Sequence, residues 1–374
     1  MKIKLLVLSI ALLTLQISCF AQGAKPAPGS PSPPPPPPPS SITPDLNRDF
    51  DKMMKEGRVG EYLVGNVSLA GGALPWDPIP VTVTCGGKIR YTTNTDPKGG
   101  FVIASTDPLG STTIKPDAKP LPAQFVGCNV DAVLAGFSSS PIVVANRNVL
   151  DSPILGTITL RREAGSEATA LSATTASAPK EALRSFEKAR NEWLENKPDR
   201  AQKDLQKAVE IYPQFAEAWY QLGKIQEAAK SPDAWNSYTK SAAADPKFDL
   251  PHRHLAALAA LSGKWPEVLE HTAAELQLNP RGTVDIWYYN ALANFQLRKP
   301  EVAEASATKS LAMDPLHTQP NTEQLLAVIL AQKQDLAGAL QHLRNCLTYF
   351  KPGSNLDLVK QQIAQIEPMV PAAK

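Results

Sequence analysis

Prolines recur along the C-terminal half of the chain at a nearly constant interval. Pro213, Pro246, Pro280, Pro315 and Pro352 are separated by 33, 34, 35 and 37 residues, and each follows two segments with apolar residues at helical spacing. A period of this length predicts a stack of helix pairs, because one pair is too short to bury a core and must pack on its neighbours.

Each predicted helix also carries a small residue at an equivalent position. Small side chains let the backbones of crossing helices approach closely. In the first helix of successive pairs this position holds Ala189, Gly223, Ala256, Ala291 and Ala327. In the second helix it holds Ala201, Ala234, Val268, Ala303 and Ala339.

The stretch 216–246 has Trp219, Leu222, Gly223, Ala234 and Tyr238 at these spacings and ends at Pro246. It resembles the tetratricopeptide repeat (TPR), whose pattern is W-x2-L-G-x2-Y, then A-x3-F, then P. The resemblance covers residues 179–353 and implies about five repeats. Thr272 and Ala307 depart from it where a large residue is usual, and Glu275 departs where a small one is usual.

A final helix is predicted over residues 354–367. Leu356, Val359, Ile363 and Ile366 form its apolar stripe, whereas Lys360, Gln361 and Gln362 fall largely off that stripe. A polar-backed helix of this kind closes the last exposed face of a repeat stack.

The TPR resemblance implies that the first helices line a concave groove that binds a peptide or a helix of a protein partner. The family's groove positions correspond here to Tyr220, Lys224, Glu227, Arg253, Ala257, Tyr288, Leu292, Phe295, Gln324 and Val328. Tyr220 and Lys224 stand where some members carry a lysine–asparagine clamp for a C-terminal carboxylate, so a chaperone-tail receptor is disfavoured. The alternative is that these side chains only pack against a neighbouring helix, which is the interpretation we favour for Trp219.

The N-terminus is typical of a secretory signal peptide over residues 1–21. Lys2 and Lys4 precede the apolar run 5–15, and small residues lie near Ala21. An alternative is a bacterial lipobox with acylation at Cys19, although Gln16 replaces the usual leucine; only then would the chain be anchored to a membrane. Removal of the two lysines leaves 36 basic and 36 acidic residues, from 38 and 36 in the full chain. A neutral chain argues against nucleic-acid binding.

Residues 22–44 are rich in proline and include the run Pro33–Pro39. Proline fixes φ and lacks an N–H, so we expect an extended, disordered spacer, with a ligand for an aromatic groove as the alternative. A short helix is predicted over residues 45–58, with Thr43 as N-cap and Pro44 at the first position.

Residues 60–162 predict a small β-sandwich. Alternating apolar residues and turn clusters indicate seven short strands, at 62–69, 81–85, 89–93, 101–104, 125–134, 142–145 and 156–160. The segments 64–68, 95–101, 127–137 and 156–160 resemble a carboxypeptidase-regulatory-like domain, a transthyretin-type sandwich. The resemblance implies an accessory module without catalytic residues.

Cys85 and Cys128 are the only cysteines of this region. In an exported chain they predict a disulfide, with two buried thiols as the alternative. Cys346 takes a small position of the fifth repeat and is expected to be a buried thiol. Residues 163–178 predict a low-complexity linker between two bodies that move independently.

No motif for catalysis, a cofactor or a metal is recognised. His252 and His254 lie two residues apart, which points them to different helix faces, and we expect them to be exposed. The sequence therefore predicts an exported, non-enzymatic scaffold of a bacterial envelope that binds a protein partner. The alternative is a cell-surface glycan-binding protein that uses the β-sandwich, which has Trp76 as its only tryptophan.

Overall fold

The computed structural model describes residues 62–70, 74–104, 125–134, 136–145, 154–163, 172–349 and 356–370. The predicted signal peptide 1–21 with Cys19, the proline-rich spacer 22–44 and the short helix 45–58 lie outside the described residues and remain predictions. The chain divides into two compact units, and within the described residues the boundary falls between Ala218 and Trp219.

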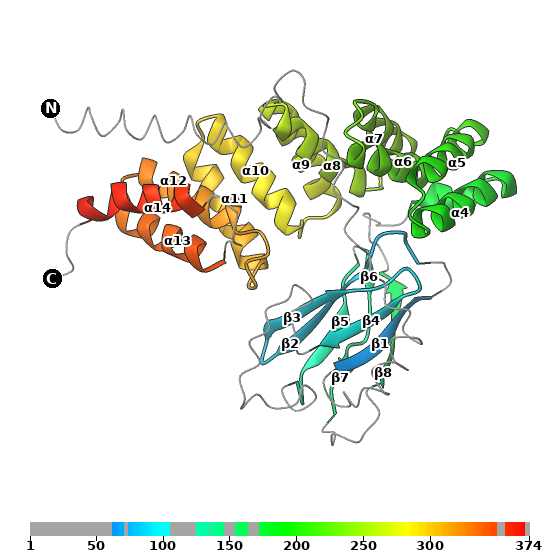
Figure 1. The fold of residues 1–374 in the computed structure, drawn as a ribbon, viewed down its shortest axis with the longest axis horizontal. Helices are drawn as coiled ribbons and strands as arrows, with labels where there is room; N and C mark the ends of the chain where they lie inside the picture. Colours follow the sequence, from blue (N-terminus) through cyan, green and yellow to red (C-terminus); the bar gives the residue numbers. More distant parts are fainter. Residues whose placement is uncertain are drawn as a thin grey trace. The chain divides into compact units, whose positions relative to one another are not determined.

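The first unit contains two four-stranded sheets (Figure 1). One has the order β4-β1-β8-β6, with β4 Gly100–Ala104, β1 Tyr62–Leu69, β8 Ile154–Arg162 and β6 Phe137–Ser138. The other has the order β3-β2-β5-β7, with β3 Lys88–Asn94, β2 Pro80–Cys85, β5 Asn129–Ala132 and β7 Ile142–Val143. Only β1 and β8 pair in parallel among these strands; the other pairs are antiparallel.

The two sheets bury one apolar core between them. Alternate residues of each strand face inward, because side chains along a strand point to opposite faces. The core includes Leu63, Val67, Val81, Val83, Phe101, Ile103, Val130, Ile158 and Leu160, from both sheets. Gly65 lies on the inward face of β1, where a Cβ would overlap the ring of Phe101. Glycine therefore makes room for that ring.

The predicted fold class is confirmed: a β-sandwich precedes a series of TPR-like helix pairs. Seven strands were expected, and the described residues contain an eighth, β6. Its Phe137 is followed by three serines, so the sequence pattern did not reveal it, whereas the equally short β7 lies in the apolar run 142–145. The likeness to a carboxypeptidase-regulatory-like domain remains a resemblance.

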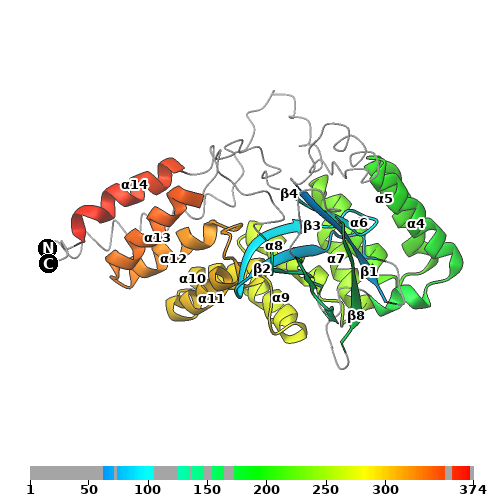
Figure 2. The same ribbon diagram turned by 90° about the horizontal axis from the view of Figure 1, so that it is seen from below.

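The helices alternate as first and second members of five pairs. The first helices are α4 Lys180–Leu194, α6 Ala216–Ala228, α8 Leu250–Leu261, α10 Val284–Gln296 and α12 Asn321–Gln332. The second helices are α5 Pro198–Ile211, α7 Asp233–Ala244, α9 Trp265–Leu278, α11 Pro300–Met313 and α13 Leu336–Tyr349. In the second unit, Figures 1 and 2 show α8–α9, α10–α11 and α12–α13 following one another side by side.

The periodic prolines end the second helices. α5, α7, α9 and α11 stop two residues before Pro213, Pro246, Pro280 and Pro315. Proline has no N–H to continue a helix, which explains its place just beyond the C-cap. Pro198 and Pro300 begin α5 and α11, where the missing N–H costs nothing.

The predicted register of the repeats is confirmed by burial. All ten small positions are buried, from Ala189 and Ala201 in the first pair to Ala327 and Ala339 in the fifth. A Cβ on Gly223 would lie 2.7 Å from the Tyr238 ring. α6 and α7 thus approach closely at this crossing.

The final helix α14 spans Leu356–Ile366. Val359 and Ile366 pack with Ala339, Leu343 and Cys346 of α13, as the apolar stripe predicts. The expectation for Gln362 was wrong, because its side chain is buried, where it accepts a hydrogen bond from Gln324 Nε2 at 3.2 Å.

The sandwich and the first helix pair belong to the same unit, although a linker between independent bodies was expected over residues 163–178. Trp76 of the sandwich lies 4.9 Å, centroid to centroid, from Phe186 of α4, and Phe186 lies 4.8 Å from Phe215. Arg190 Nη2 donates to the Pro97 carbonyl at 3.0 Å. Ala173–Ser177 forms a 3₁₀ turn, and Thr175 of this turn donates to Glu217.

Candidate functional site

The structure places the predicted groove residues on α6, α8, α10 and α12, as expected, but it buries several of them. Tyr220, Phe295, Gln324 and Val328 are buried. Lys224, Glu227, Arg253, Ala257, Tyr288 and Leu292 remain partly exposed.

A hydrogen-bonded network joins α6, α7 and α8. Glu227 Oε2 accepts from the Tyr238 hydroxyl at 2.6 Å and lies 2.7 Å from His254 Nδ1. Burial alone would raise the pKa of Glu227, but the contacts with His254 and Tyr238 hold it below its ordinary value. Tyr220 lies edge-on to His254, with ring centroids 5.5 Å apart. These contacts fix the positions of the side chains on this part of the surface.

A second cluster surrounds Arg253 of α8, whose side chain is 31% exposed. Its Nη2 lies 3.5 Å from Oε1 of Glu275, a fully buried residue of α9. The charges of Asp249, just before α8, and Asp285, in the first turn of α10, also act on Arg253. We call Asp249, Arg253, Glu275 and Asp285 the Arg253 cluster.

The cluster contains more carboxylates than its single guanidinium can pair. Neither carboxylate oxygen of Asp249 or Glu275 has a hydrogen-bond partner, and neither does Arg253 Nε. Burial raises the pKa of the Glu275 carboxyl to about 8, although Arg253 opposes the shift. Burial likewise raises the pKa of Asp249. Burying ionisable groups in this way costs folding free energy. Groups with strongly shifted pKa values are found most often at functional sites.

Aromatic side chains follow Asp285 on α10. Tyr288 and Leu292 pack beside Phe295 against Leu325 and Val328 of α12. Burial raises the pKa of Tyr289 to about 12, and Asp285 and Glu227 add to the shift. We call the partly exposed side chains on the first helices α6, α8 and α10 the band; they are Lys224, Glu227, Arg253, His254, Ala257, Asp285, Tyr288, Tyr289 and Leu292.

The C-terminal helix α14 covers Gln324, one of the predicted groove residues. Gln324 is buried and donates to Gln362 of α14. The usable part of the predicted surface is therefore the band on α6, α8 and α10.

The expectation that His252 and His254 are exposed was wrong. His252 Nδ1 lies 3.4 Å from His271 Nδ1, and burial lowers the pKa of His252 to about 4. His254 belongs to the Glu227 network instead, so the two side chains do point in different directions. The part of the chain that is described contains no group of three histidine, cysteine, aspartate or glutamate side chains arranged to hold a metal ion.

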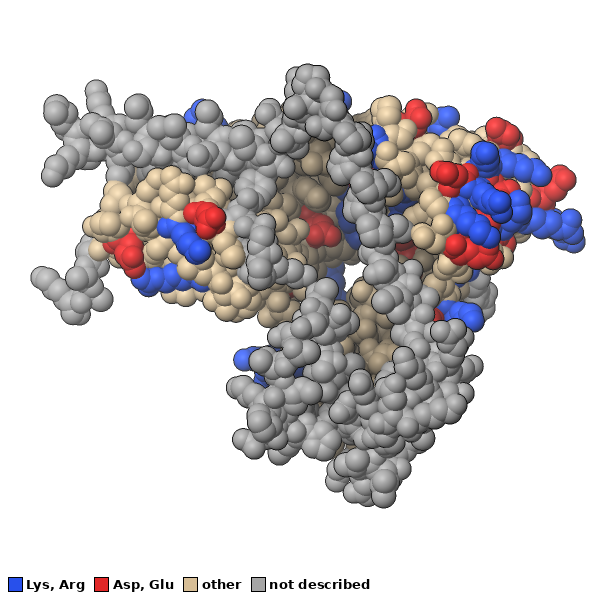
Figure 3. Space-filling model, in the orientation of Figure 1, with Lys and Arg blue, Asp and Glu red and all other residues tan. Residues whose placement is uncertain are grey.

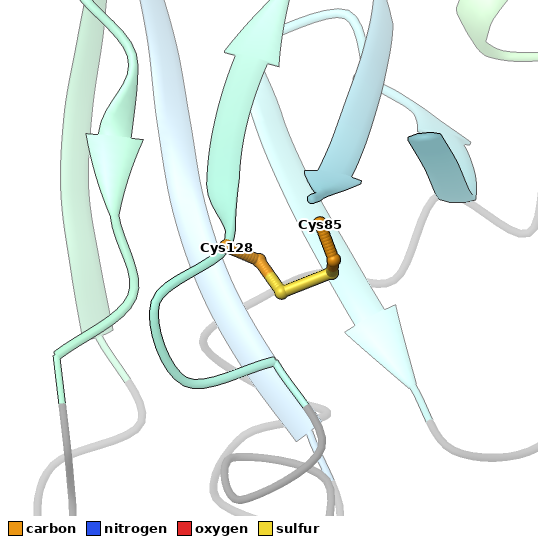
Figure 4. Close-up of a disulfide and its surroundings, with 2 residues drawn as sticks. All are labelled: Cys85 and Cys128. Carbon is orange, nitrogen blue, oxygen red and sulfur yellow. A yellow bond between two sulfur atoms is a disulfide. The ribbon is translucent and has the colours of Figure 1, made fainter. Parts of the chain in front are cut away.

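A disulfide joins Cys85 at the end of β2 to Cys128 beside β5, as predicted (Figure 4). Cys346 is free and buried in the core of the last repeat. Burial raises the pKa of its thiol to about 12, and the Glu323 charge adds to the shift. This thiol is structural rather than reactive, because the thiolate is the nucleophile.

The sandwich offers little for sugar stacking among its described residues. Trp76 is occupied by its contact with Phe186. Apolar side chains that are exposed there include Val133, Val143 and Ile154, which are aliphatic.

In Figure 3, basic and acidic side chains are interspersed over α4 and α5, as on a solvated surface. No helix in the described ranges is long and apolar enough to cross a membrane.

Sequence reasoning did not identify Tyr238 and His254 as members of the Glu227 network, or Asp249, Glu275 and Asp285 as members of the Arg253 cluster. One signal was present, since Glu275 stands where the repeat pattern requires a small residue. A charged residue at a packing position is a departure that a functional site can explain. Its pairing with Arg253 depends on the approach of α9 to α8, which the pattern does not specify.

No protein-family model matches the sequence, and no curated protein sequence is similar to it. Among solved structures, PilF of Pseudomonas aeruginosa is 19% identical, with a TM-score of 0.43 over 50% of this chain and 85% of PilF. MamA of Desulfovibrio magneticus RS-1 is 16% identical, with a TM-score of 0.41 over 46% of this chain and 96% of MamA. YrrB, described as a TPR protein with an unusual peptide-binding site, is 18% identical, with a TM-score of 0.43 over 48% and 92%. These likenesses are too distant to assign a function.

Proposed function

We propose that this chain is an exported, non-enzymatic scaffold of a bacterial envelope, and that its helical repeats bind a peptide or helix of a protein partner. The observation that supports this proposal most strongly is the band across α6, α8 and α10. It combines aromatic, aliphatic and charged side chains that are partly exposed on successive first helices. Such a mixture suits recognition of an extended peptide or of an amphipathic helix.

Rigid placement of these side chains favours binding. Glu227, His254 and Tyr238 hold one another by contacts of 2.6–3.1 Å. Lys224 Nζ lies 5.6 Å from the centre of the Tyr220 ring. Side chains that are fixed before binding lose less conformational entropy when a partner docks.

The alternative of a glycan-binding sandwich is less favoured. Sugar-binding sites commonly present an aromatic face, and the described sandwich packs Trp76 against α4. The sandwich is better suited to act as a stable support for the helical repeats. Anchoring through Cys19 remains a separate proposal, tested by lipid labelling of the exported chain.

A pull-down from envelope extract tests the proposal with the mature full-length chain. Two variants change the band: Lys224→Glu reverses a charge, and Leu292→Glu places a charge on a partly buried apolar position. Leu261→Glu on α8 and Val143→Glu on β7 are matched controls, since both wild-type side chains are 59% exposed outside the band. Circular dichroism first establishes that each variant folds.

We expect the wild type and both control variants to recover the same protein. The two band variants should recover at most about one tenth as much of it. A sugar assay on the same eluates measures glycan. Retention of that protein by both band variants, or loss with Val143→Glu alone, would show that the helical band is not the binding surface.

A further inference from the structure

The third repeat carries a histidine where its two neighbours carry a tryptophan. His252 takes the position of α8 that Trp219 takes in α6 and Trp287 in α10, four residues before the small residue at each helix crossing. Tryptophan stays uncharged at every pH, whereas an imidazole takes up a proton close to neutral pH. The packing of the third repeat therefore contains a group that can become charged in mild acid.

His252 faces a second histidine across the contact between α8 and α9. Its Nδ1 lies 3.4 Å from Nδ1 of His271 on α9, within hydrogen-bond distance, and the ring centroids are 5.6 Å apart. A neutral imidazole has one N–H and one acceptor nitrogen, whereas a charged imidazole has an N–H at both nitrogens. One Nδ1 can donate to the other while at most one ring is charged. With both rings charged, two N–H groups oppose each other and the hydrogen bond is lost.

The pair has no ion-pair partner that would stabilise its charged form. The other three histidines each lie within 3.2 Å of a glutamate oxygen; they are His254, His317 and His342. No ion pair of the described residues involves His252 or His271. From α7, the uncharged Trp235 ring packs edge-on to His271, with centroids 5.6 Å apart.

The charged groups around the pair lie on α9 or just before it. Glu270, an exposed residue, and Glu267 act on His271, while the charge that acts on His252 is that of His271 itself. Lys264 occupies Glu267 at 3.1 Å. The pair therefore depends on staying uncharged to hold α8 and α9 together at this point.

The direction of the pH effect follows from the two rings. Burial, with the charge of His271, lowers the pKa of His252 from 6.5 to about 4, and burial also lowers the pKa of His271. An opened α8–α9 pair takes up protons near the ordinary histidine pKa, so it binds more protons than the closed pair in this window. The stability of the closed contact is full above about pH 6.5 and is lost as pH falls toward about 4.

We propose that the His252–His271 contact is an acid-sensitive joint between α8 and α9, which opens when both rings become charged. α8 also carries Arg253, His254 and Ala257 of the band, so opening of the joint displaces them. A partner bound at neutral pH is then released in acid. Release of the partner rests on the proposed function, whereas opening of the joint does not.

A second contact between the same helices titrates in a different range. Arg253 of α8 pairs with Glu275 of α9, and the pKa of Glu275 is raised to about 8. This carboxyl is already mostly protonated when the acid window begins, so it does not supply the change below pH 6.5. Burial raises the pKa of Asp249, just before α8, which favours the closed form in acid and opposes the histidine pair.

Hydrogen exchange of the mature full-length chain at pH 7 and pH 5, corrected for the intrinsic exchange rates, tests the joint without a known partner. In the wild type the opening constant of α8 and α9 should rise about twentyfold between these pH values, from the shift of His252 alone. The amides of α11, a helix without histidine, should change less. No rise in α8 and α9, or an equal rise in α11, would overturn the inference.

Variants assign the effect to the two rings. His252→Asn and His271→Asn each put an uncharged amide near the position of Nδ1, and each should reduce the rise, while the double variant should remove it. Leu261→Asn is the matched control, because Leu261 is an exposed residue of α8 and this variant should behave as the wild type. The same pH dependence in the double variant as in the wild type would also overturn the inference. Circular dichroism establishes that each variant folds, and if the double variant does not, either single variant decides.

A pull-down separates this inference from the proposed function. Protein recovered by the wild type at pH 7 should be eluted at pH 5, whereas the double variant should retain it. Recovery of no protein at pH 7 would contradict the proposed function, and the exchange experiment would still decide whether the joint opens. Equal elution from the wild type and the double variant would show that the joint does not control release.

Discussion

The β-sandwich and the helical repeats bury different chemistry. Among the described residues of the sandwich, buried side chains with polar atoms are few: the Thr95 hydroxyl accepts from the Ile79 N–H, and the Tyr62 hydroxyl is buried without a hydrogen-bond partner. The repeats beyond Trp219 bury Asp249, Glu275, Glu323, Gln324 and several hydroxyl residues. The sandwich is thus held by apolar packing and a covalent bond, whereas the repeats carry ionisable groups within their packing.

This difference indicates which region is suited to recognition. An apolar core that a disulfide closes contributes stability that depends little on pH. Buried charges are costly to stability and persist where they serve another role, which is our hypothesis for the Arg253 cluster. The predictions below test this division of roles, from the largest expected effect to the smallest.

Replacing Cys85 and Cys128 by serine should destabilise the sandwich by ~4 kcal/mol, because the bridge closes a loop of 43 residues. Hydrogen exchange followed by mass spectrometry in urea measures each region separately. The loss should appear in β1, β2, β5 and β8. An equal loss in α8–α13 would show that the two regions do not differ in this way.

Gly223→Ala should destabilise the α6–α7 pair by ~1–3 kcal/mol, the usual cost of overpacking. The new Cβ would meet the buried Tyr238 ring at 2.7 Å, and that ring is held by Glu227 and His254. Helix propensity alone would stabilise the alanine variant by ~1 kcal/mol. A rise in the free energy of unfolding of this pair would therefore contradict the close approach.

Glu275→Gln should remove a pH dependence from the repeats. The pKa of Glu275 is raised from 4.5 to about 8 in the folded protein, so folding takes up a proton between these values. Its contribution to stability is present at low pH and falls by up to ~1.4 kcal/mol per pH unit as pH rises through this window.

The measurement is exchange of α9 amides between pH 6.5 and 8. This range lies above the window from about 4 to 6.5 in which His252, with its lowered pKa, contributes the opposite slope. The wild type should lose stability across the range relative to Glu275→Gln, with Glu270→Gln behaving as the wild type. Parallel curves for all three proteins would show that Glu275 is ionised throughout.

Cys346 should resist alkylation in the folded protein. Its thiol is enclosed in the last repeat, and its raised pKa leaves little thiolate at pH 8. Mass spectrometry under non-reducing conditions should show Cys85 joined to Cys128, with Cys346 labelled only after denaturation. Rapid labelling in native buffer would indicate that α13 and α14 open readily.

The repeat architecture could be predicted because its signals are local and periodic. Prolines end the second helices, and small residues such as Gly223 and Ala256 mark the crossings. The short β6 was missed because Phe137 is the one apolar residue of 137–140, whereas the equally short β7 lies in the apolar run 142–145. The division after Ala218 was also missed, since Trp76 and Phe186 are far apart in sequence and their contact leaves no local pattern.

The candidate site could be predicted only in part. The TPR resemblance identified the helices and positions such as Arg253 and Tyr288, but not which of them are covered. Gln324 became buried because α14 packs over it, and His254 became half-buried through Glu227 and Tyr238. These outcomes depend on the angles between helices, which single-sequence patterns leave open.

The most direct measurement is hydrogen exchange of the mature full-length chain with and without the protein recovered by pull-down. Our account predicts slower exchange at the exposed ends and loops of α6, α8 and α10, with no change in β1–β8. Protection confined to the sandwich strands, with the helices unchanged, would contradict the claim that the repeats are the binding surface.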